Sequence, residues 1–204
     1  MTALTILSGI MASAIHVVSG PDHLAAVTPI VVDSKRKAWR VGLAWGLGHI
    51  SGMLAIGLLV FFFKELIPFG AISSYSEQLV GLILLILAFW VFAKLPEKNT
   101  AVHIHTHPKK ERKVLSFSIG FVHGLAGVSH LILLLPVLSF ESTIDSLTYI
   151  AGFGLGSVLS MVMYAGVIGV LRQRVDPEHH PKLNISLRFA TGLFALVVGV
   201  FWLM

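Results

Sequence analysis

Histidines recur in two segments of the chain with the same spacing. His16 and His23 lie seven residues apart, as do His123 and His130, and the second pair follows the first by 107 residues. Seven residues are about two helical turns, so on a continuous helix both rings of a pair face one side. Imidazole nitrogens are good ligands for divalent transition metals. The spacing therefore predicts a metal site assembled from both segments.

Two further polar residues belong to the same candidate site. Asp22 is the only acidic residue deep within an apolar segment, where a carboxylate needs a cation, a hydrogen-bond donor or a proton. His49 follows two glycines that would let its helix approach a neighbour closely. Imidazoles with one carboxylate suit nickel, cobalt, zinc, copper or ferrous iron, and suit magnesium or calcium poorly. The predicted metal ligands are His16, Asp22, His23, His49, His123 and His130.

Other histidines have two interpretations. A lone intramembrane histidine such as His49 is often a hydrogen-bonding group between helices, whereas four in register across a repeat favour function. The polar segment between the third and fourth apolar spans holds a weaker candidate set, which either gathers metal or is a solvated His-rich loop. These residues are His103, His105 and His107. The pair His179 and His180 is interpreted as a plain loop.

The composition is that of an integral membrane protein. Of 204 residues, 55% are hydrophobic and 12% are charged, and the mean hydropathy is +0.86. A soluble domain carries about 25% charged residues. Only helices are expected, because lipid offers no partner for open backbone groups. There is no cysteine, which excludes disulfides, thiolate metal ligands and dithiol redox chemistry. The net charge of +5 lies in loops and does not indicate nucleic-acid binding.

Six apolar spans predict six transmembrane helices. The first is too long for one straight crossing and contains Gly20-Pro21, so we expect a broken helix there. The predicted spans cover roughly residues 3–32, 41–63, 78–95, 115–139, 147–171 and 187–204.

The two halves of the chain repeat one pattern. Gly46-Leu47-Gly48-His49 resembles Gly154-Leu155-Gly156-Ser157, in addition to the matched histidine segments. Three spans per unit turn the second unit upside down, so the prediction is an all-α membrane protein with a 3+3 inverted-topology repeat. The predicted units are residues 1–95, a His-rich cytoplasmic loop at 96–114, and residues 115–204.

The basic residues predict the orientation. Fourteen of the 15 Lys and Arg residues lie between spans one and two, three and four, or five and six. Positive loops stay in the cytoplasm, so the prediction is a multi-pass protein of the cell (inner) membrane with both termini outside. The first span lacks a basic start and carries half of the repeat, so we do not expect its cleavage as a signal peptide. The residues interpreted as interfacial anchors are Trp39, Trp45, Trp90 and Trp202.

The residues around the first pair of histidines resemble a known family. His16, Asp22 and His23, with Gly46-Leu47-Gly48-His49 in the next span, are similar to the nickel–cobalt transporter (NicO) superfamily and its UreH-like branch, named for a urease accessory membrane protein. In that family four residues separate the histidine from Asp-His in one helix, whereas here five do. The resemblance implies transport of Ni2+ or Co2+, inward or outward. It implies metal ligation for His16, Asp22 and His23 alone, and the other ligands depend on the repeat.

We therefore expect a secondary transporter of divalent transition-metal ions. Ni2+ or Co2+ comes first, with Zn2+ and Fe2+ as alternatives, and transport would proceed by alternating access around the His/Asp site. No enzymatic activity, permanent cofactor or nucleic-acid partner is expected; the partners are the metal ion and the lipid bilayer, and a homo-oligomer is left open. Two alternatives remain: a proton-coupled exporter of a small anion or organic solute, and an intramembrane metal-dependent hydrolase.

Overall fold

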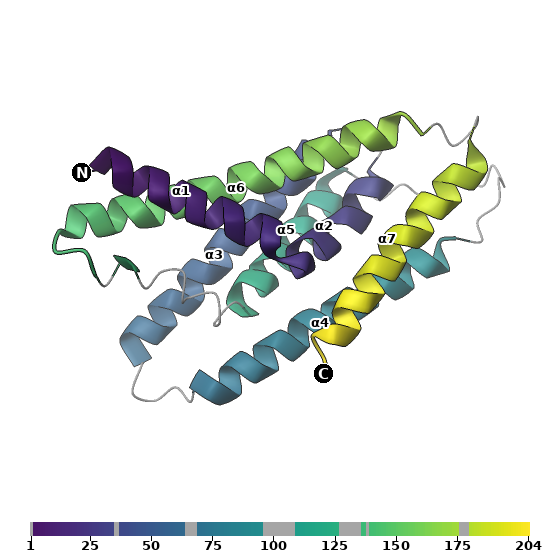
Figure 1. Cartoon of the computed structure of the whole chain (residues 1–204). Helices are drawn as coiled ribbons and strands as arrows, with labels where there is room; N and C mark the ends of the chain where they lie inside the picture. Colours follow the sequence, from purple (N-terminus) through teal and green to yellow (C-terminus); the bar gives the residue numbers. More distant parts are fainter. Residues whose placement is uncertain are drawn as a thin grey trace.

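The computed structural model describes residues 2–34, 37–63, 69–95, 109–126, 136–137, 139–175 and 180–204. Within these residues the chain forms seven α-helices and no β-strand (Figure 1). The helices are α1 (Thr2–Ser19), α2 (Pro21–Asp33), α3 (Trp39–Phe63), α4 (Phe69–Ala93), α5 (Lys109–Ala126), α6 (Thr143–Gln173) and α7 (Pro181–Phe201).

Five of the described helices are long and apolar enough to cross a membrane. They are α1, α3, α4, α6 and α7, and the apolar part of α5, Lys113–Ala126, is shorter. Large apolar side chains face outward on several of them, as at Leu4, Phe89 and Met163, where lipid can cover them. The chain is therefore a multi-pass membrane protein. The remainder of the predicted fourth span follows Ala126 and lies largely outside the described residues.

The first apolar span is broken at the predicted place. Helix α1 ends at Ser19, Gly20 has an extended backbone (φ −84°, ψ 98°), and Pro21 opens α2. Proline lacks the N–H that a continuing helix would use, but it fits the first turn of a new one. The Gly20 amide still donates to the His16 carbonyl oxygen at 3.0 Å. The two helices therefore meet at a single residue, without an intervening loop.

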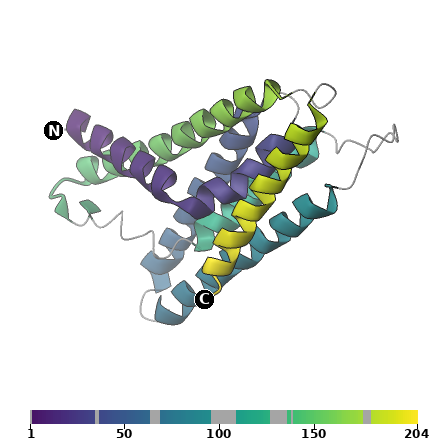
Figure 2. The ribbon, with the colours of Figure 1, turned by 45° about the vertical axis from the view of Figure 1, so that its right-hand side comes forward.

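Helices from the two halves of the chain pack in pairs. Helix α1 packs mainly against α6, α3 against α5 and α6, and α4 against α7 (Figures 1 and 2). Glycines permit the closest contacts: a Cβ on Gly48 of α3 would collide with the Phe117 carbonyl oxygen of α5. Similarly, a Cβ on Gly156 of α6 would lie 2.7 Å from the Ile10 carbonyl oxygen of α1. Small residues thus bring the helix backbones together.

Four helices start several residues earlier than the apolar runs predicted. Helix α4 begins at Phe69, α5 at Lys109, α6 at Thr143 and α7 at Pro181, each ahead of its predicted span. Hydropathy marks only the part of a helix that needs lipid, whereas hydrogen bonding continues into polar sequence until a capping residue ends it. At α7 the start is set by proline in the first turn, which favours helix initiation.

Candidate metal centre

A buried carboxylate joins the two halves of the chain. Asp22 Oδ1 lies 3.1 Å from Nδ1 of His23, its neighbour on α2. Asp22 Oδ2 lies 2.8 Å from Nε2 of His123, which comes from α5. Asp22 is 2% exposed and His123 is 1% exposed. Each carboxylate oxygen can accept a hydrogen bond from one imidazole, which compensates for burying its charge.

Two more imidazoles approach His23 from its other neighbours. The ring centroids of His16 on α1 and His23 are 4.6 Å apart, and those of His23 and His49 on α3 are 5.0 Å apart. His16 and His49 are 6.0 Å apart, with nearly parallel rings. All three residues are buried. Four histidines and one aspartate, supplied by four helices, thus converge on one interior region.

The break in the first span produces this arrangement. Asp22 and His23 occupy the first turn of α2, where the helix dipole favours a negative charge. On one continuous helix adjacent residues point about 100° apart, so Asp22 could not share a face with both His16 and His23. A Cβ on Gly20 would collide with His23 Nδ1 and lie 3.0 Å from Asp22 Oδ1. Glycine at position 20 therefore leaves room for both polar side chains.

The structure brings together five of the predicted metal ligands. They form two groups in which the potential ligand atoms lie within 4.8 Å of one another: His16, His23 and His49, and Asp22, His23 and His123. The sixth predicted ligand and the weaker cytoplasmic set lie outside the described residues, and they stay predictions. These residues are His130, His103, His105 and His107.

One aromatic residue of the site was misinterpreted from sequence. Trp45 was predicted to be an interfacial anchor, but it is fully buried and stacks on His49 with centroids 4.9 Å apart and planes 14° apart. Its ring centroid is also 5.5 Å from those of His23 and His123. The available signal was spacing, because Trp45 precedes His49 by four residues and so shares its helix face. In the other half, Phe153 of α6 stacks on His16 at 6.1 Å.

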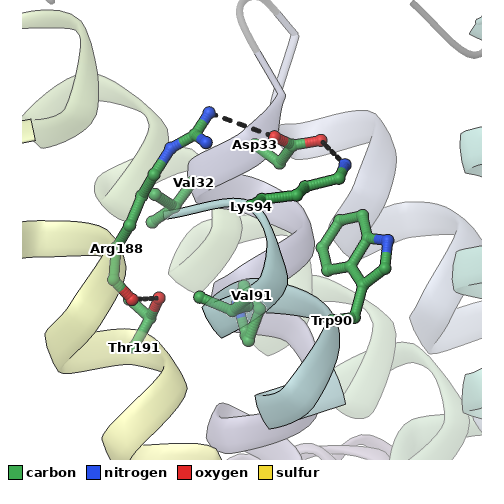
Figure 3. A pocket seen from close by; sticks show the side chains of 8 residues that line it. Val32, Asp33, Trp90, Val91, Lys94, Arg188 and Thr191 are labelled. Atoms are coloured by element: carbon green, nitrogen blue, oxygen red, sulfur yellow. Dashed lines mark hydrogen bonds and ion pairs between the residues drawn. The ribbon is translucent and has the colours of Figure 1, made fainter. Parts of the chain in front are cut away.

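A second polar cluster lies at the far end of α2. Asp33 Oδ1 is 3.3 Å from Arg188 Nη2, and Asp33 Oδ2 is 3.5 Å from Lys94 Nζ (Figure 3). The Lys94 ammonium also sits 3.8 Å from the centre of the Trp90 ring. These residues line a small pocket between α2, α4 and α7. The pairing ties together the ends of three helices.

The two clusters lie at opposite ends of α2. Asp33 follows Asp22 by eleven residues, which corresponds to about 16 Å along the axis at about 1.5 Å per residue. That length is about half of a hydrocarbon core roughly 30 Å thick. Asp33 lies among cationic side chains at helix ends, which are suited to the membrane surface. The histidine cluster is therefore about half a hydrocarbon thickness away from these charged helix ends.

Comparison with known proteins gives a family and several relatives. Residues 5–201 match the family described as "Cytochrome C biogenesis protein transmembrane region". The chain is 36% identical over 200 residues to the urease accessory protein UreH of Bacillus sp. (strain TB-90), covering 90% of this chain and 83% of UreH. No solved structure matches it.

Two plant proteins are also similar. The chain is 30% identical to Chloroplast protein FOR GROWTH AND FERTILITY 2 of Arabidopsis thaliana and 29% identical to Chloroplast protein FOR GROWTH AND FERTILITY 1. Each alignment covers 95% of this chain but only 54% and 57% of the respective relative. The chain thus spans little more than half the length of these two proteins.

Proposed function

We propose that this chain, which belongs to the family of the cytochrome C biogenesis protein transmembrane region and to the same family as UreH, transports divalent transition-metal ions. The observation that carries the proposal is the convergence of four histidines and Asp22 in the buried interior of the helices. The resemblance to nickel–cobalt transporters favours Ni2+ or Co2+ as cargo, with Zn2+ and Fe2+ as alternatives. The family description alone does not lead to this function. The chain has no cysteine, so thiol chemistry is not open to it.

The ligand chemistry supports a transition-metal cargo. An ion that enters the bilayer loses its hydrating water, which costs much free energy. Protein ligands must therefore take the place of that water. Imidazole nitrogens do this well for nickel, cobalt and zinc. The Asp22 carboxylate adds one negative charge, which lowers the cost of burying a dication. His130 remains a proposed ligand because it is the repeat equivalent of His23.

Alternating access is the mechanism that the packing supports. Contacts in one half have counterparts in the other: a Cβ on Gly46 would meet Val158, and a Cβ on Gly154 would meet Ile50, 108 residues out of phase. Such reciprocity supports two inverted units of three spans, 1–95 and 115–204, joined by the cytoplasmic loop. The units would rock about the shared histidine cluster. The basic loops would face the cytoplasm, and both termini would lie outside.

Flux measurements test this proposal. Purified full-length protein in proteoliposomes should take up radioactive Ni2+ or Co2+, and His23→Ala should abolish uptake because it removes a residue common to both ligand groups. His180→Ala is the matched control, since His180 is exposed at the start of α7. The absence of flux for all four metals, Ni2+, Co2+, Zn2+ and Fe2+, in the unmodified protein would refute the proposal.

The same experiment separates the alternatives. A hydrolase would need a general base beside its metal, and Asp22 is the only carboxylate in the two described ligand groups. Tightly bound stoichiometric metal without flux would nonetheless favour an enzyme. An anion exporter would need positive charge in its site, whereas the described cluster contributes a carboxylate, Asp22. Flux of an anion in place of metal would favour the exporter.

A further inference from the structure

The buried cluster is two sets of ligands rather than one. His16, His23 and His49 form a set made of imidazoles alone, and Asp22, His23 and His123 form a set with a carboxylate. Within each set the ligand atoms lie no more than 4.8 Å apart, and His23 belongs to both. The two sets are therefore adjacent, and a displacement of a few ångströms would carry an ion from one to the other.

We propose that these sets are two successive positions for one metal ion, and that the imidazole-only position selects the metal. This inference rests on the proposed transport of divalent metals. Two dications held so close together would repel strongly in a low-dielectric interior, and both would need the same His23 side chain. The chain therefore carries one ion at a time. The carboxylate set attracts the ion, and the imidazole set decides whether it passes.

The ligand types explain the division of roles. A carboxylate attracts any divalent cation by charge and is a good ligand for Mg2+, Ca2+ and Mn2+. Three neutral imidazoles supply no charge and bind these hard cations poorly, whereas they bind Ni2+, Co2+ and Zn2+ well. A hard cation can thus be held at Asp22 and still be refused at His16 and His49.

The surroundings of the imidazole set reinforce the selection. Trp45 stacks on His49, and Phe153 stacks on His16, so two of the three imidazoles in this set have a stacked aromatic neighbour, whereas Trp45 meets His123 of the other set at a tilt. Mg2+ loses its water reluctantly and keeps several water ligands in most protein sites. Stacked aromatic neighbours on two of the three imidazoles offer few polar groups to hold that shell. An ion that accepts three nitrogen ligands does not need it.

A pair of matched substitutions tests the division. His49→Asp puts a carboxylate into the imidazole set, whereas His123→Asp makes the same change in the set that already has one. Proteoliposomes loaded with each variant are assayed for radioactive Ni2+ uptake in the presence of increasing Mn2+. In His49→Asp, the Mn2+ concentration that halves Ni2+ uptake should be at least about tenfold lower than in the unmodified protein, as expected for a change of metal ligation. His123→Asp should weaken uptake without changing the relative effect of Mn2+.

The possible results separate the proposal of two successive metal positions from the proposal of metal transport. Equal sensitivity to Mn2+ in both variants would mean a single site and would overturn the division. His16→Asp is the second variant for the imidazole set and should reproduce the His49→Asp result if the latter does not fold. Binding of two Ni2+ ions per chain in a variant with alanine at positions 103, 105 and 107 would also overturn the proposal. The absence of uptake of Ni2+, Co2+, Zn2+ and Fe2+ by the unmodified protein would refute the transport function itself.

Discussion

Helix α2 carries two aspartates in opposite surroundings. Asp22 is buried between two imidazoles, whereas Asp33 is partly exposed between Lys94 and Arg188. Lysine and arginine keep their charges, so Asp33 is already neutralised and serves to tie helix ends together. An imidazole carries no permanent charge, so its hydrogen bond to Asp22 leaves the carboxylate able to ligate a cation. The partners, rather than the residue type, separate a candidate ligand from a structural carboxylate.

The largest expected effect, and the strongest test of the difference between Asp22 and Asp33, comes from neutralising each carboxylate in turn. Asp22→Asn should weaken Ni2+ binding by more than about 100-fold, beyond the range seen for residues that only orient ligands. Asp33→Asn is the matched control and should leave the dissociation constant within about threefold, because its contacts lie about 16 Å away along the helix. Isothermal titration of the purified protein measures both. Similar losses in the two variants would contradict the distinction.

The next largest effect should come from the residue that separates α1 from α2. Gly20→Ala puts a methyl group against His23 Nδ1 and beside Asp22 Oδ1, so the site must distort. Metal affinity should fall by about 10- to 100-fold, the range for lost ligand positioning. Gly57→Ala is the control, since nothing lies within 4 Å of a Cβ there. Unchanged Ni2+ affinity in Gly20→Ala would show that position 20 does not shape the site.

An effect of intermediate size is expected from replacing Trp45, which packs against the buried histidines. Trp45→Ala removes a fully buried ring and should cost about 3–5 kcal/mol of stability, as large-to-small core changes do. It should also weaken Ni2+ binding, because His49 loses the ring that it stacks on. Trp45→Phe keeps an aromatic face and should recover most of both properties. Thermal unfolding and Ni2+ titration compare the two variants. Equal Ni2+ affinity in Trp45→Ala and Trp45→Phe would show that the Trp45 ring does not position His49.

The smallest effect is expected at the exposed end of α2. Asp33→Asn should lower the free energy of unfolding by about 1 kcal/mol, because ion pairs with solvent access contribute little. The loss should shrink as salt is added. A double-mutant cycle with Lys94→Gln measures the pairwise part, which should be below about 1 kcal/mol. A much larger coupling energy would mean that this cluster is more than a structural tie.

The sequence predicted the local structure of the first span better than the contacts that other residues make around it. The break at Gly20 and the gathering of His16, Asp22 and His23 followed from a glycine-proline pair inside an apolar run. Residue types close together in the chain were enough to predict these two features. The stacking of Trp45 on His49 was missed because a tryptophan near a span end has two common uses, and only packing distinguishes them.

Longer-range features were harder to obtain. The repeat indicated that His123 belongs with His16 and His23, but not that it would bond to Asp22 rather than approach His49 more closely. Nor did the pattern of charges pair Asp33 with Arg188, which is 155 residues away. Such contacts depend on how helices cross, and crossing angles are set by the small residues at each interface. Hydropathy gives the helices but not their neighbours.

The single-residue joint between α1 and α2 has a mechanical consequence. Helix α1 is held mainly by α6, whereas α2 packs against α4 and α7 as well. In the proposed transport cycle, a tilt of α6 relative to α7 would rotate His16 against Asp22 and His23, because a single residue joins α1 to α2. The geometry of the ligands would then depend on how the helices are arranged, so that ion release and the change of conformation would be coupled.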